Sequence, residues 1–185
     1  MKTISIMGIV GSLRKESYNH AALIAAQKLV PAGVVLTLTG IQGIPVYNQD
    51  SENTLPASVL EFKQQIRAAD AVLFATPEYN YSLPGGLKNA IDWASRPYGE
   101  SAWAGKPAAI LGASVGSFGT ARAQYHLRQI LVALDMPVVS QPEVMIGNAA
   151  QKFDQNGLLV DEATREFIRK LLVALARLVE INRAS

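Results

Sequence analysis

The sequence contains no cysteine, which excludes disulfide bonds, thiolate catalysis and cysteine-ligated metals. Charged residues make up only 17% of the chain and the net charge is +2, without the run of basic residues that indicates a nucleic-acid partner. No segment approaches the roughly 20 apolar residues of a membrane span, and the apolar start at 2–7 is too short for a signal peptide. We therefore expect a cytoplasmic protein that binds neither nucleic acid nor membrane, and any redox chemistry must come from a bound cofactor.

The hydrophobic pattern predicts one α/β domain covering residues 1–185. Hydrophobic residues make up 49% of the chain, enough for a substantial core. Strands are expected at 4–10, 34–38, 71–75 and 108–111, with a fifth inside 138–146, and helices at 18–30, 56–69, 86–95, 120–134 and 161–181. This alternation predicts a doubly wound five-stranded parallel sheet with helices on both faces.

The last predicted helix carries an apolar stripe at helical spacing. Its inward-facing residues are expected to be Phe167, Ile168, Leu171, Leu172, Leu175 and Leu178.

The segment 76–85 is the most informative loop, because it directly follows the apolar strand 71–75. A loop at the carboxyl end of a parallel strand is where open α/β sheets bind ligands. The loop reads TPEYNYSLPG, with two tyrosines and two prolines, and proline fixes φ. Aromatic rings beside exposed backbone amides suit a flat heteroaromatic ligand.

The loop after the first strand, residues 11–19, is rich in hydroxyl groups and includes Ser12, Arg14, Ser17 and Asn19. Backbone amides at a helix N-terminus favour an anion, and arginine binds phosphate oxygens. The segment lacks both the Walker A spacing and the G-x-G-x-x-G fingerprint of dinucleotide sites. It predicts a cradle for a monophosphate without a metal; the alternative is a polar turn in which Ser17 only caps the helix.

A third loop, GASVGSFG at 112–119, follows the fourth strand. Its glycines allow either close approach of a ligand or simply a tight turn from strand to helix. In the strand order 2-1-3-4-5, the loops after strands one, three and four adjoin one crevice.

Together these segments resemble the flavodoxin-like NAD(P)H-dependent FMN reductases, and within them the bacterial quinone and chromate reductases. The resemblance covers residues 3–150 and depends on GSLR at 11–14 with Ser17 and Asn19, on PEYNYS at 77–82 with LKNAIDW at 87–93, and on SVG at 114–116 with RAQ at 122–124. Thr120 departs from the family pattern, in which a second glycine follows Gly119.

The resemblance implies a flavodoxin-like fold and FMN as cofactor, with no catalytic side chain and no metal. The residues implied to hold the FMN phosphate and ribityl chain are Ser12, Leu13, Arg14, Ser17, Tyr18 and Asn19. Those implied to line the isoalloxazine ring are Pro77, Glu78, Tyr79, Asn80 and Tyr81, with Ser114 and Gly116 at its border. FAD is expected to bind poorly, because an adenylate would need room beyond Arg14.

The implied activity transfers hydride from NADH or NADPH to FMN and then to a quinone or similar acceptor, such as free flavin, an azo dye or chromate, by a ping-pong mechanism. Two alternatives are a non-enzymatic flavodoxin-type electron carrier and a redox-sensing module that holds FMN without turnover. Carriers of that type are usually strongly acidic, whereas this chain is near neutral.

The family resemblance also implies a homodimer or homotetramer. Arg122 and Tyr125 lie three apart on a predicted helix and are expected at the interface, with Glu143 as a charge partner. Glu78 has three open roles: orienting its loop, touching the ring or reaching a second subunit. His20 and His126 are interpreted as structural or surface residues.

Overall fold

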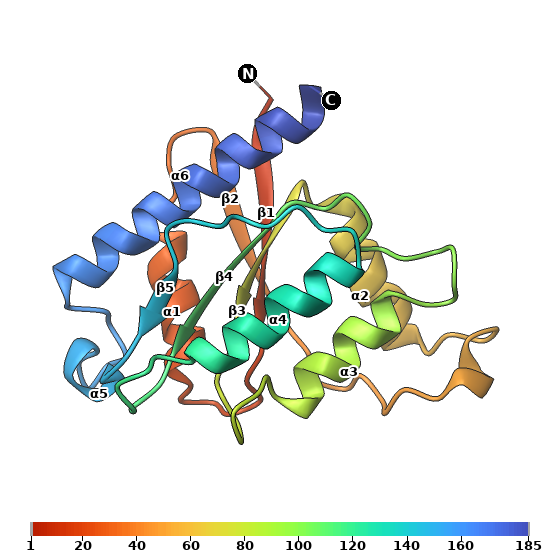
Figure 1. Ribbon diagram of the computed structural model, residues 1–185, viewed down its shortest axis with the longest axis horizontal. Helices are drawn as coiled ribbons and strands as arrows, with labels where there is room; N and C mark the ends of the chain where they lie inside the picture. The colour runs from red at the N-terminus through yellow and green to blue at the C-terminus, as the bar shows by residue number, and fades with distance from the viewer. Residues whose placement is uncertain (1, 185) are drawn as a thin grey trace.

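The computed structural model describes residues 2–184 and contains a five-stranded parallel sheet in the order β2-β1-β3-β4-β5 (Figure 1). The strands are β1 (Ile4–Val10), β2 (Val34–Gly40), β3 (Ala71–Ala75), β4 (Ala108–Ala113) and β5 (Val144–Ile146). The predicted fold class and strand order are therefore confirmed. β1 and β3 occupy the centre of the sheet, where strands are covered on both faces.

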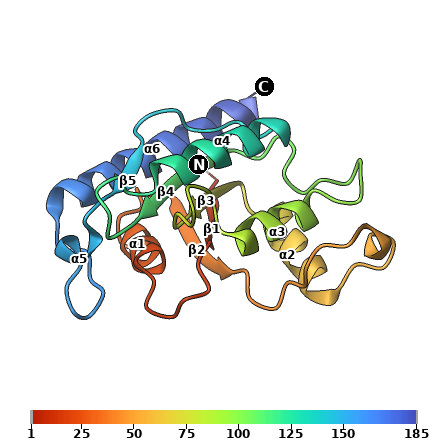
Figure 2. The ribbon, with the colours of Figure 1, turned by 60° about the horizontal axis from the view of Figure 1, so that its bottom comes forward.

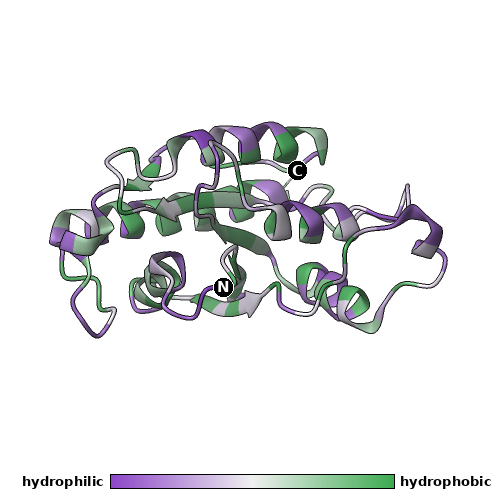
Figure 3. Ribbon diagram, turned by 90° about the horizontal axis from the view of Figure 1, so that it is seen from below, coloured by the Kyte–Doolittle hydropathy of each residue, from purple (hydrophilic) through white to green (hydrophobic). Residues whose placement is uncertain are grey.

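Helices connect the strands and cover the sheet on both faces. They are α1 (Tyr18–Gln27), α2 (Ala57–Ala68), α3 (Gly85–Ala94), α4 (Ala121–Ala133), α5 (Ala149–Lys152) and α6 (Glu162–Ala184), with a short 3₁₀ helix η1 (Gln49–Ser51). One hydrophobic cluster joins the sheet to α1 and α6, and a second joins the opposite face to α2, α3 and α4. Viewed from below, the strands are largely hydrophobic and the helices carry their hydrophilic residues outward (Figure 3).

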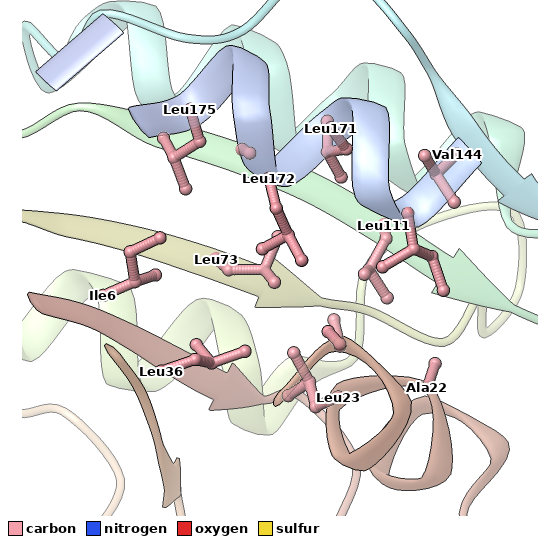
Figure 4. Packing of buried hydrophobic residues seen from close by; sticks show 14 of the residues in the cluster. Ile6, Ala22, Leu23, Leu36, Leu73, Leu111, Val144, Leu171, Leu172 and Leu175 are labelled. Atoms are coloured by element: carbon pink, nitrogen blue, oxygen red, sulfur yellow. The ribbon is translucent and has the colours of Figure 1, made fainter. Parts of the chain in front are cut away.

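The α1–α6 side of the core shows how the strands and helices interlock. Leu172 and Leu175 of α6 lie above Leu73 of β3, and Leu23 of α1 lies below the same face (Figure 4). All four side chains are fully buried. Burial of a leucine side chain contributes on the order of 1.5–3 kcal/mol, so α6 is held to the sheet mainly by this apolar stripe.

Two expectations about the C-terminal half were wrong. β5 covers only 144–146, because Val138 makes an isolated bridge to Ala108 and the chain then leaves the sheet. Phe167 is 51% exposed, whereas Val179 is buried. Successive helical residues lie about 100° apart, so a helix that buries Ile168 turns Phe167 away from the sheet.

The tryptophans confirm the packing interpretation over a ligand-stacking one. Trp93 and Trp103 are buried, and their indole N–H groups donate to the carbonyls of Pro45 (2.8 Å) and Ile91 (2.9 Å). Within residues 2–184, the structure has no helix long and apolar enough to cross a membrane.

Asp70 ties three distant segments together at the amino end of the sheet. Its carboxylate accepts hydrogen bonds from the backbone N–H (2.9 Å) and hydroxyl (3.2 Å) of Ser5. It also pairs with the Arg183 guanidinium of α6 at 2.7 Å. Burial by itself raises the pKa of Asp70, but the hydrogen bonds from Ser5 and Arg183 outweigh it and lower the pKa below its usual value.

We predict that Asp70→Asn lowers the free energy of unfolding at neutral pH by about 1–3 kcal/mol, because it removes hydrogen bonds to a charged group. A carboxyl with a depressed pKa stabilises the fold above its unfolded pKa and loses that contribution as the pH falls toward its folded pKa. The variant should therefore lose less stability than wild type below about pH 4. Urea unfolding across this range, with exposed Glu180→Gln as control, checks the prediction; parallel pH profiles for Asp70→Asn and wild type would contradict it.

Candidate functional site

Three loops converge at the carboxyl edge of the sheet, because β1, β3 and β4 are neighbours. Val10 is in register with Ala75, and Ala75 with Leu111. The sheet pairing continues into the loops, where the N–H of Gly11 donates to the carbonyl of Ala75 (2.9 Å). Figure 1 shows this edge at the bottom, and Figure 2 brings it forward. A side chain at Gly11 would approach the Ala75 carbonyl oxygen to 2.8 Å, so this contact requires glycine.

The first loop presents hydrogen-bond donors at the start of α1. The Ser12 hydroxyl accepts from the N–H of Arg14 (3.3 Å) and the Ser17 hydroxyl from the N–H of Asn19 (3.2 Å), so each retains its own proton. Ser17 is thus the N-cap of α1. Among the hydrogen bonds within residues 2–184, none uses the backbone N–H of Lys15 or Tyr18 as donor. Such a donor set at a helix N-terminus fits a phosphate group.

Asn19 has a different principal contact from the predicted one. Its side-chain amide N–H donates to the carbonyl of Ala113 (2.9 Å), and its amide oxygen accepts the N–H of Ala113 (2.8 Å). Asn19 is 2% exposed. Its side chain therefore links α1 to the end of β4, and only one amide N–H is left for a phosphate.

Arg14, Leu13 and Tyr18 surround the outside of the first loop. Leu13 is 59% exposed, and the Arg14 side chain is exposed as well. The Arg14 guanidinium lies 5.9 Å from the centre of the Tyr18 ring, which packs against Phe153 at 5.4 Å. Arg14 is thus accessible to an anion arriving from solvent.

Two cavities lie beside Arg14, of about 370 Å³ and 450 Å³. There is therefore open space beyond Arg14, contrary to the reason given for excluding FAD, and shortage of room there gives no discrimination between FMN and FAD.

The second loop is a tight hairpin. Tyr79 and Ser82 exchange two backbone hydrogen bonds of 2.9 and 3.0 Å. The residues between them, Asn80 and Tyr81, have φ of 49° and 68°. Two consecutive positive φ values define a type I′ turn, which asparagine tolerates well and tyrosine does not. The turn exposes the rings of Tyr79 and Tyr81, while Pro77 is buried.

Glu78 anchors this hairpin to the start of α4. Its carboxylate accepts the backbone N–H groups of Arg122 (3.1 Å) and Ala123 (3.3 Å) and the Nε–H of Arg122 (2.5 Å). The Glu78 side chain is 8% exposed, and the Arg122 guanidinium lies 3.8 Å from the centre of the Tyr81 ring. Among the three open roles of Glu78, these contacts support orientation of its own loop.

His126 also holds the hairpin, a contact that the sequence interpretation missed. Its Nδ1 lies 3.0 Å from the hydroxyl of Ser82. The available signal was its spacing, because Arg122 and His126 are four apart and lie on the same face of α4. Among the described residues, no group of three His, Asp or Glu side chains is arranged to hold a metal ion.

The third loop is closed by its own hydrogen bonds. The N–H of Gly116 donates to the Ser114 hydroxyl (3.1 Å), and the carbonyl of Gly116 accepts from Asn148 (3.1 Å). Thr120 at its end has φ of 69°. A left-handed conformation explains why the family pattern has glycine there. The Thr120 hydroxyl accepts from the Gln124 side chain (3.2 Å), which compensates part of the strain.

The three residues expected at a subunit interface make contacts within the chain. Glu143 accepts from the Tyr125 hydroxyl (3.3 Å) and lies 3.7 Å from the Nε of Arg128. Arg122 pairs with Glu78 instead of Glu143. Tyr125 is 48% exposed, so its ring is available to a further contact.

Comparison with known proteins gives consistent matches. Residues 4–151 match the family described as NADPH-dependent FMN reductase. The chain is 60% identical over 173 residues to an NAD(P)H-dependent FMN reductase of Pseudomonas aeruginosa, covering 93% of both chains. It is 44% identical to a quinone reductase of Escherichia coli K12, covering 96% of each. The structure superposes on FerB, a flavoenzyme NAD(P)H:(acceptor) oxidoreductase of Paracoccus denitrificans, with a TM-score of 0.89, 41% identity and coverage of 97% and 99%.

We predict that Asn19→Ala lowers the free energy of unfolding by about 2–4 kcal/mol, because it leaves two buried backbone groups of Ala113 unpaired. Urea unfolding followed by tryptophan fluorescence measures the change. Exposed Glu16→Ala in the same loop is the control and should change stability by less than about 0.5 kcal/mol. Equal losses for the two variants would show that the link to β4 contributes nothing.

Proposed function

This chain belongs to the NADPH-dependent FMN reductase family, and on that premise we propose that it is an FMN-dependent oxidoreductase that uses NAD(P)H to reduce quinones. The observation that carries the proposal is the convergence of a phosphate-binding loop and an aromatic hairpin at one edge of the sheet. Quinone is the favoured acceptor because several relatives are named quinone reductases. The electron-carrier and sensor alternatives are not favoured, since these relatives are enzymes.

We propose that the first loop holds the FMN phosphate and ribityl chain. The hydroxyl groups of Ser12 and Ser17, the free amides at the start of α1 and the Arg14 guanidinium are all donors, as a phosphate requires. Leu13, Tyr18 and the remaining N–H of Asn19 complete this set. When bound, FMN supplies hydride acceptance from the nicotinamide and delivery to the acceptor.

We propose that the hairpin from Pro77 to Tyr81 lines the flavin ring. Its turn exposes backbone N–H groups and two aromatic side chains, which suit in-plane hydrogen bonds and stacking. Ser114 and Gly116 border the ring from the third loop. No side chain is needed as acid, base or nucleophile, because the protein contributes position and electrostatics.

We also propose a homodimer or homotetramer with Arg122, Tyr125 and Glu143 at an interface. The exposed ring of Tyr125 and the partly exposed Arg122 lie on one helix near the proposed flavin site. Their contacts within the chain leave a planar guanidinium and a phenol available, which are common interface anchors. Light scattering of the purified chain measures this assembly directly.

Replacement of Arg14 by Ala should weaken FMN binding by about 1.5–3 kcal/mol, the usual contribution of hydrogen bonds to a charged group. Calorimetric titration of the FMN-free protein measures it, with exposed Arg177→Ala on α6 as a control for removal of a positive charge. An unchanged FMN affinity in Arg14→Ala would remove this residue from the phosphate site.

Steady-state kinetics with NAD(P)H and a benzoquinone should follow a ping-pong pattern, because donor and acceptor need the same face of the flavin. Tyr79→Ala should lower kcat/KM for the quinone by up to about tenfold, the effect of losing one aromatic contact. Retention of FMN should change little, because the phosphate contacts lie elsewhere. Intersecting double-reciprocal lines would contradict the mechanism, and absence of nicotinamide oxidation would contradict the function.

A further inference from the structure

A cavity of about 370 Å³ lies between the first loop and the carboxyl end of β2. The first loop contributes Arg14 and Lys15, and α1 contributes His20. Thr39 at the end of β2 and Gln42 just beyond it form the opposite wall. The cavity therefore adjoins the proposed FMN phosphate loop but reaches to a strand that contributes nothing to the FMN site.

The charge of this cavity is of one sign. Arg14 and Lys15 are cationic, His20 adds an imidazole, and no carboxylate lines the cavity. The neighbouring cavity of about 450 Å³ shares these three residues but also contains Glu16 and Asp154. The β2-side cavity is thus the one in which an anion would meet positive charge without a competing acid.

The wall formed by β2 also lacks acidic side chains. In doubly wound dinucleotide-binding domains, an acid after the second strand binds the ribose 2′-hydroxyl of NADH, whereas a nearby arginine accommodates the 2′-phosphate of NADPH. Here β2 ends at Gly40, and the first acid after it in sequence is Asp50. A side chain on Gly40 would collide with the Gln42 amide, so the glycine seats a neutral donor where an acid would repel phosphate.

From this arrangement we propose that the cavity binds the adenosine 2′-phosphate of NADPH and makes the enzyme prefer NADPH to NADH. Arg14 and Lys15 would pair with the phosphate, and Gln42 would donate to it or to the ribose. This inference rests on the proposed function, because it assigns one end of the hydride donor to a site beside the flavin.

The test introduces a negative charge without changing side-chain size. In the FMN-loaded enzyme, Gln42→Glu should lower kcat/KM for NADPH by about tenfold and leave that for NADH within about twofold. The matched control is Gln129→Glu, an exposed position on α4, which should change neither value. Lys15→Ala should shift the preference in the same direction, and Lys28→Ala on the exposed side of α1 should not.

Binding of adenosine 2′,5′-bisphosphate gives a readout that does not depend on turnover. By calorimetry, wild type should bind it about tenfold more tightly than adenosine 5′-monophosphate, and Gln42→Glu should remove the difference. An enzyme that oxidises neither nicotinamide would contradict the proposed function, whereas the bisphosphate titration still judges the cavity.

Two results would overturn the proposal. One is an equal effect, or no effect, of Gln42→Glu on NADPH and NADH, accompanied by equal affinities for the two adenosine phosphates. The other is loss of bound FMN in Lys15→Ala, seen as release of the flavin absorbance, which would assign the cavity to the FMN phosphate instead.

Discussion

The paired hydrogen bonds between Asn19 and Ala113 fix the first loop relative to the third, although 94 residues separate them in the chain. Both partners are buried, so the contact is shielded from competing water. Because Asn19 is in the first turn of α1, the orientation of the helix N-terminus follows from where β4 ends. A phosphate held at that N-terminus is thereby placed at a defined position against the rest of the crevice.

The hairpin after β3 is held in a comparable way from the other side. Glu78 spans the first amides of α4 and the Arg122 guanidinium, which in turn lies over the Tyr81 ring. A carboxylate at a helix N-terminus is favourable because of the helix dipole. The energy of these contacts holds Asn80 and Tyr81 in a left-handed turn that tyrosine does not adopt by preference. This is the strain expected at a binding site and compensated by its surroundings.

The first loop therefore has two surfaces with different chemistry. Its inner surface presents hydroxyl groups and amides toward the crevice formed by β1, β3 and β4. Its outer surface, with Lys15, faces the end of β2, where the walls are neutral or basic. A single short segment can thus contact a flavin phosphate and a nicotinamide phosphate from opposite sides, which relates cofactor retention to donor selection.

The sequence by itself determined the five strands, their parallel order, the two-layered core and the three loops at one edge, because hydrophobic periodicity and strand-ending glycines are local signals. It also indicated the hydroxyl-rich loop, whose serines follow the first strand directly. Only the tertiary structure decided that Asn19 bonds to Ala113, that Glu78 faces Arg122, and that Phe167 lies outside the core. The prolines seemed to define the second loop, yet its shape comes from the Tyr79–Ser82 pairing and two positive φ angles. These features depend on which side chains meet across long sequence separations, and that follows from how the layers pack rather than from any local pattern.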